Sequence, residues 1–146
     1  MEQPDSAMTQ RVWQRVTAQP MQPGPETLKT LIAMEMQTRQ TLLPLAKQMP
    51  HHAHTLMQMA SHCGRHIRTL QGIHTLTEGC RADVRAAAQS MATSPNSLRR
   101  LYGTSLKLAT QYAARRDDEQ YGLIFDAMAV AKAQHCATLL ELLGTL

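Results

Sequence analysis

Four long segments of the chain carry apolar residues at alternating spacings of three and four, and no other feature limits the possible folds as strongly. The segments span residues 25–49, 51–77, 94–116 and 118–143. Because an α-helix turns once every 3.6 residues or so, this spacing places the apolar side chains in one stripe along each helix. The pattern predicts an all-α protein in which four helices bury their stripes in a common core.

The chain has the length of one domain. It has 146 residues, of which 43% are hydrophobic and only 3% aromatic, and the four segments are rich in Ala, Leu, Gln and Met. These residue types favour helices. A chain of this length also buries enough apolar surface to fold without disulfides. We therefore expect a single helical core.

Polar or ionisable residues interrupt each predicted stripe close to its middle. The stripes are Leu28, Leu31, Glu35, Thr38, Leu42, Leu45 and Met49; Leu56, Met59, Cys63, His66, Leu70 and Ile73; Leu98, Leu101, Ser105, Leu108 and Tyr112; and Phe125, Met128, Lys132, His135, Leu139 and Leu142. An unpaired polar group in a core costs a few kcal/mol. Antiparallel packing would bring the interruptions to one level, where they could pair with one another.

The N-terminal part, residues 1–24, is predicted to be an accessory helix and a linker. Residues 6–17 form an amphipathic stretch that carries Trp13, which we expect to dock this helix. The Pro-rich and Gly-containing segment 20–25 cannot continue the helix. Residues 25–146 then form the predicted bundle.

The ends of the first two bundle helices are marked by proline and glycine. The first helix is expected from Pro25 to Met49, with a kink at Pro44. The second is expected to run from residue 51 to residue 77 and to stop at Gly79. Residues 80–93 contain too little apolar surface for a bundle helix and are predicted to form a long crossover.

Capping residues mark the last two helices. Ser94 and Pro95 are expected at the start of the third helix, which would extend to residue 116. Asp117 and Gln120 have the spacing of a capping box, so the fourth helix is expected to begin at residue 118 and to end near Gly144. Two helix pairs joined by one long crossover are typical of ferritin-like bundles.

The chain resembles the bacterial ferritin-like, rubrerythrin-related family. The stretches that carry the resemblance are residues 12–16, 31–35, 72–79 and 118–144, in this order. The resemblance implies a centre of two iron or two manganese ions with oxidase or peroxidase chemistry. By position, Glu35 matches the glutamate of the first helix, and His66 and His135 match the two histidines of the family's Glu-x-x-His pairs.

The other family ligands are replaced in this chain. Cys63 and Lys132 stand where the resemblance places the glutamates of the Glu-x-x-His pairs, and Ser105 stands where it places the glutamate of the third helix. Two iron ions need about four carboxylates to neutralise and bridge them. We therefore expect no di-iron oxidase, and a structural or interaction role instead, in which Lys132 pairs with Glu35 inside the core.

Three metal hypotheses remain open beside this interpretation. Glu35, Cys63 and His66 offer one oxygen, one sulfur and one nitrogen ligand, a set suited to a single Zn²⁺ or iron ion. Haem held between His66 and His135 is a weaker hypothesis, since no attachment motif accompanies the two residues. A third hypothesis is a metal-collecting surface formed by His51, His52, His54, His62 and His74.

Charge and cysteine content limit the partners and the compartment. The net charge is +4, but Arg99-Arg100 and Arg115-Arg116 are isolated pairs without interleaved aromatic residues, so nucleic acid is not expected as a partner. The three cysteines show no disulfide spacing, which favours the cytoplasm. No apolar run is long enough to cross a bilayer. A homodimer or another protein partner is compatible with these features.

Overall fold

The computed structural model describes residues 6–17, 26–86 and 92–146, and in these residues the regular structure is entirely helical. The chain divides into two compact units. One comprises Glu26–Ser97, and the other comprises Met1–Pro25 together with Leu98–Leu146. The prediction of an all-α protein is confirmed for the described residues.

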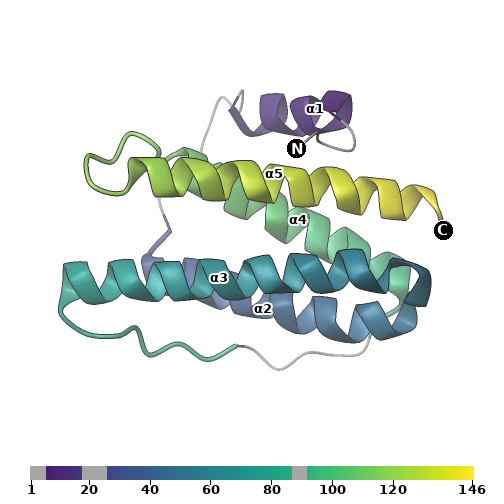
Figure 1. Ribbon diagram of the computed structural model, residues 1–146, viewed down its shortest axis with the longest axis horizontal. Helices are drawn as coiled ribbons and strands as arrows, with labels where there is room; N and C mark the ends of the chain where they lie inside the picture. The colour runs from purple at the N-terminus through teal and green to yellow at the C-terminus, as the bar shows by residue number, and fades with distance from the viewer. Residues whose placement is uncertain (1–5, 18–25, 87–91) are drawn as a thin grey trace. The chain divides into compact units, whose positions relative to one another are not determined.

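The first of these units, Glu26–Ser97, is built on a helical hairpin. Helix α2 (Leu28–Gln48) and helix α3 (Ala53–Glu78) pack against each other and are joined by a short 3-10 helix, η1 (Pro50–His52) (Figure 1). Thr27 begins α2, because its side-chain oxygen accepts a hydrogen bond of 3.1 Å from the backbone N–H of Thr30. The two stripes therefore run antiparallel through one hairpin.

Gly79 ends α3 and turns the chain into the crossover. Its φ of 80° lies in the left-handed region, where glycine has no steric penalty. The crossover is then held to α3 by Gln71, whose amide accepts from the N–H of Ala82 at 2.9 Å and donates to its carbonyl at 3.1 Å. His74 adds a 2.6 Å hydrogen bond from Nδ1 to the carbonyl of Cys80.

The second unit contains helices α1 (Ser6–Thr17) and α5 (Gly122–Gly144) and the part of helix α4 (Ser94–Ala113) from Leu98 onward. Helix α1 lies against α5. Its most buried described side chains are Val12 and Val16, whereas Trp13 is only partly buried. Docking of the accessory helix thus relies on the two valines as much as on the tryptophan.

The turn before α5 differs from the prediction. The fourth helix was expected to begin at residue 118, but residues 114–121 form turns, and α5 begins at Gly122. Asp118 uses its carboxylate to accept hydrogen bonds of 2.9 and 2.8 Å from the N–H groups of Gln120 and Tyr121. An aspartate followed by polar residues can cap a turn as well as a helix. In this protein Asp118 caps a turn.

Smaller corrections concern other helix ends. Helix α4 ends at Ala113 rather than at residue 116, and α3 begins at Ala53 because residues 50–52 form η1. Helix α2 includes Pro44, and the kink or loosened turn expected there stays a prediction. The linker predicted at 20–25 lies outside the described residues, as do residues 87–91 of the crossover.

The four predicted stripes are buried almost without exception. Of their members only Leu28 is partly exposed, while every other one is buried. The polar interruptions are buried with the apolar residues around them: Glu35, Cys63, Ser105 and Lys132 show no exposed surface. The helical period in the sequence therefore identified the core residues of both units.

We predict opposite effects of alanine at two glycines of the second unit. A β-carbon at Gly122 would overlap the carbonyl oxygen of Arg116 in the turn before α5, whereas one at Gly103, inside α4, would meet open space. Gly122→Ala should lower the free energy of unfolding by about 1–3 kcal/mol. Gly103→Ala should raise it by about 0.5–1 kcal/mol, since alanine favours the helix. Urea denaturation of both variants measures the two signs.

Candidate functional site

A buried hydrogen bond joins the two helices of the hairpin at the middle of their stripes. Oε2 of Glu35, on α2, lies 2.8 Å from Nδ1 of His66, on α3. The Glu35 side chain is fully buried, and His66 is 8% exposed. At this distance the imidazole and the carboxylate form a hydrogen bond across the two helices. Two of the predicted site residues are thus brought together.

This pair satisfies one of the two carboxylate oxygens of Glu35, Oε2, in a core that would otherwise penalise it. Leu31, Leu42 and other apolar residues of α2 flank Glu35 along the stripe. A charge in such surroundings is strongly destabilised unless a hydrogen-bonded partner accompanies it. Thr38, one turn after Glu35, is satisfied by its own helix, through a 2.8 Å hydrogen bond to the carbonyl of Met34. His66 is therefore the side chain from the facing helix that compensates Glu35.

Cys63 lies one turn before His66 on the buried face of α3. Its side chain is fully buried and forms no disulfide. The spacing of three residues places Cys63 and His66 on the same face, as the sequence predicted. Within residues 6–17, 26–86 and 92–146, however, no group of three or more His, Cys, Asp or Glu side chains has a geometry that could hold a metal ion. The three-ligand hypothesis thus stays a prediction.

The other predicted site residues belong to the second unit. Lys132 and His135 are buried on one face of α5, and Ser105 is buried on α4. The hydroxyl of Ser105 has no hydrogen-bond partner among the described residues. The predicted pair of Glu35 with Lys132 would join the two units. That pair stays a prediction, as does the expected arrangement of all six residues at one level.

Carboxylates are scarce in the core. Among the described residues, Glu35 is the only Asp or Glu side chain that is buried. The residues that the family resemblance matches to metal-binding glutamates are otherwise a thiol, a hydroxyl and an ammonium, at Cys63, Ser105 and Lys132. Two iron ions held by one carboxylate would keep most of their charge unneutralised. One buried carboxylate is fewer than the roughly four that a pair of iron ions needs.

Burial also determines the chemistry of Cys136, one residue after His135. The thiol donates a long hydrogen bond of 3.9 Å to the carbonyl of Tyr102 on α4. Burial raises the pKa of Cys136 to about 12, although the positive charge of Lys132 acts in the opposite direction. A thiol that stays protonated is a poor nucleophile and a poor ligand. Cys80, by contrast, is exposed.

Two contacts of structural importance were not anticipated. His74, which the sequence grouped with a metal-collecting surface, is 6% exposed and anchors the crossover through Cys80. Arg115 lies over the ring of Phe125, at 5.6 Å from the ring centroid, and so links the turn to the start of α5. The burial of His74 could have been predicted from its spacing of four residues from Leu70, which places it beside the buried stripe of α3.

The raised pKa of Cys136 leads to a prediction for alkaline pH. The unfolded thiol loses its proton near its ordinary pKa of 9.0, whereas the folded one keeps it to about pH 12. Unfolding therefore releases a proton in this window, and stability falls as pH rises through it, while below pH 9 the contribution is constant. Cys136→Ala should flatten this fall relative to the wild type, as measured by urea denaturation at several pH values.

The matched control for this prediction is Cys80→Ala, because Cys80 is exposed. Its stability should follow the wild-type pH dependence. Identical slopes for the wild type and Cys136→Ala between pH 9 and pH 12 would contradict the role of this thiol.

Comparison with known proteins gives no information on the function of this chain. No family model, curated protein or solved structure matches the chain. In the described part of the chain, no helix combines the length and the apolar character needed to span a membrane. The geometry of the buried polar residues is therefore the basis for any assignment.

Proposed function

We propose that this protein is a ferritin-like four-helix bundle in which a polar core has replaced the two-metal centre, and that it acts as a structural or interaction protein rather than as a di-iron oxidase. The observation that carries this proposal is the 2.8 Å hydrogen bond between Glu35 and His66. Both residues match metal ligands of the family by position. In this protein the carboxylate and the imidazole are engaged with each other.

The charge balance of the core supports the same conclusion. In ferritin-like bundles a glutamate from each of two helices and a Glu-x-x-His pair from each of the other two face the metals. Here the only buried carboxylate among the described residues is Glu35, and a buried lysine, Lys132, stands at the position of a ligand. An ammonium at that position repels a divalent cation. Oxygen chemistry at two metals is therefore not part of the proposal.

A hydrogen bond can replace a metal in the structural role of the site. A metal bridges two helices by binding one ligand from each, and the Glu35–His66 pair likewise joins α2 and α3. The bond is directional, so it specifies which turn of α3 faces Glu35. The proposed core thus keeps the helices in register without a bound ion.

A single transition metal is the second candidate function. It is favoured by Cys63 and His66 lying one turn apart on the buried face of α3, with Glu35 already in contact with His66. Zn²⁺ or iron would be held by thiolate, imidazole and carboxylate, with a fourth position open. Binding would have to break the Glu35–His66 hydrogen bond and remove the proton of Cys63.

Metal analysis separates the two functions. The full chain is purified without added metal, incubated with Zn²⁺ or, without oxygen, with Fe²⁺, desalted, and analysed for metal content and absorption. We expect no stoichiometric metal and a thermal midpoint that neither ion changes, because the ligands are engaged with each other. One zinc per chain would favour the single-site function, and two irons per chain would contradict both.

Two histidine variants make the result specific. His66→Ala removes the buried imidazole, whereas His54→Ala removes an exposed one from the same helix. If the wild type binds one metal that His66→Ala loses and His54→Ala keeps, the single-site function replaces the proposed one. Metal lost in both variants indicates binding at the protein surface.

A further inference from the structure

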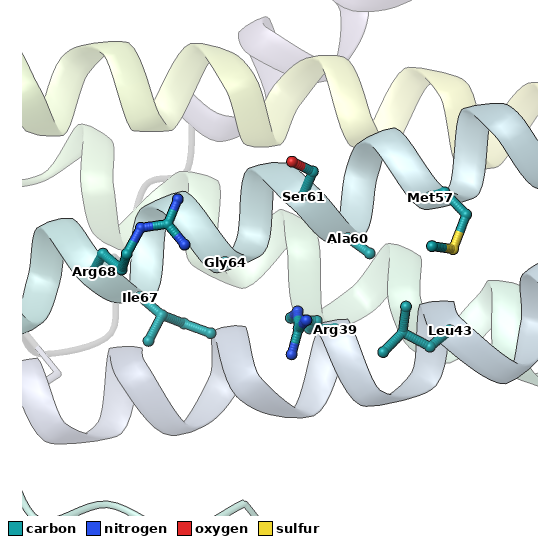
Figure 2. Close-up of a pocket in the computed structure, with 8 residues that line it drawn as sticks. All are labelled: Arg39, Leu43, Met57, Ala60, Ser61, Gly64, Ile67 and Arg68. Atoms are coloured by element: carbon teal, nitrogen blue, oxygen red, sulfur yellow. The ribbon is translucent and has the colours of Figure 1, made fainter.

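The outer face of the α2–α3 hairpin carries a groove that the proposed function does not use. Its volume is about 460 Å³, within the range of about 300–1,000 Å³ that small-molecule sites occupy. Figure 2 shows the groove between the two helices. The lining residues are Arg39 and Leu43 from α2, and Met57, Ala60, Ser61, Gly64, Ile67 and Arg68 from α3.

One end of the groove is basic. The guanidinium groups of Arg39 and Arg68 approach the same point, since a β-carbon on Gly64 would lie 3.7 Å from Nη1 of Arg68 and 3.8 Å from Nε of Arg39. Gly64 leaves this point empty because it has no side chain. A glycine inside a helix lowers its stability by about 1 kcal/mol relative to alanine. Here it keeps the space between two arginines from different helices open.

Neither arginine is neutralised by an acid of the described chain. Arg39 and Arg68 are exposed, and neither makes a salt bridge within residues 6–17, 26–86 and 92–146. Two guanidinium groups held this close repel each other unless an anion lies between them. Ser61, one turn before Gly64 on α3, also lines the groove.

The other end of the groove is apolar. Leu43 and Met57 lie there, and Ala60 lies between them and the arginines (Figure 2). Met57 is 49% exposed, which makes it one of the few large apolar side chains that the described chain leaves in solvent. From Met57 to Arg68 the groove follows α3 for about 16 Å, at a rise of about 1.5 Å per residue.

We propose that this groove binds a small anionic amphiphile, namely a phosphate monoester that carries a short apolar tail. The phosphate would lie over Gly64 between Arg39 and Arg68, because a guanidinium pair matches the charge of a phosphate dianion and donates paired hydrogen bonds to its oxygens. The tail lies along Ala60 toward Leu43 and Met57. This proposal is independent of the buried pair, since it uses the outer face of the hairpin.

Calorimetric titration with octyl phosphate, below its micelle-forming concentration, tests the proposal on the full chain. Saturable binding of one molecule per chain is expected. Inorganic phosphate tests the head group alone, and octyl glucoside tests the tail alone; both should bind at least tenfold more weakly. Binding should also weaken as the salt concentration rises, because the head group is held by charge.

Three arginine variants locate the head group. Arg39→Gln and Arg68→Gln should each weaken octyl phosphate binding about tenfold or more, the effect of losing one charged hydrogen bond. Arg65→Gln is the matched control, because Arg65 is exposed on the same helix but does not line the groove. The helical content of each variant is checked by circular dichroism, and glutamine keeps the helix propensity of arginine.

A glycine pair tests the point between the arginines. Gly64→Glu places a carboxylate there and should abolish binding by competing internally, whereas Gly72→Glu adds the same charge two turns later on α3, in open space. Several results would overturn the proposal: no saturable binding, equal binding of inorganic phosphate, equal losses in Arg65→Gln and Arg39→Gln, or undiminished binding by Gly64→Glu. Preferential binding of a glutamate-rich peptide over octyl phosphate would overturn it as well.

Discussion

A carboxylate buried between two helices needs a partner, and in this protein the partner is an imidazole from the facing helix. The hydrogen bond between Glu35 and His66 lies at the middle of the stripes that hold α2 against α3. Apolar contacts are not directional and tolerate small shifts of one helix along the other. A buried hydrogen bond does not tolerate such shifts, because its donor and acceptor must stay aligned. We therefore regard this pair as the interaction that sets the register of the hairpin.

The core could be predicted because its signal is periodic. Spacings of three and four residues identified the buried members of all four long helices, including Glu35, His66 and Lys132. The helix ends were less predictable, because an aspartate such as Asp118 caps a turn by the same hydrogen bonds with which it caps a helix. The same local hydrogen bonds are therefore compatible with a turn and with a helix.

The candidate site could be predicted only as a set of residues. The sequence placed Glu35 and His66 on facing stripes, but it did not indicate that these two side chains hydrogen-bond each other. Which side chain of a facing helix reaches the carboxylate depends on rotation and offset, which a periodic pattern does not encode. The groove was missed for a related reason: Arg39, Gly64 and Arg68 resemble an ordinary solvated face until two helices bring them together.

The two faces of the hairpin differ in how their charged side chains are paired. On the inner face one carboxylate oxygen of Glu35 is hydrogen-bonded to His66 within the protein. On the outer face Arg39 and Arg68 are compensated by no acid of the described chain, which favours an external anion. Binding capacity is therefore expected where charge is unsatisfied, outside the core and not within it.

A double-mutant cycle on Glu35 and His66 tests the central claim most directly. The free energies of unfolding of Glu35→Ala, His66→Ala and the double variant are compared with the wild type, in chelator-treated protein. The account predicts a coupling energy of about 1–3 kcal/mol between the two residues. A control cycle of Glu35→Ala with Thr75→Ala, an exposed residue bonded to its own helix, should be additive. Additive effects of Glu35→Ala and His66→Ala would contradict the account.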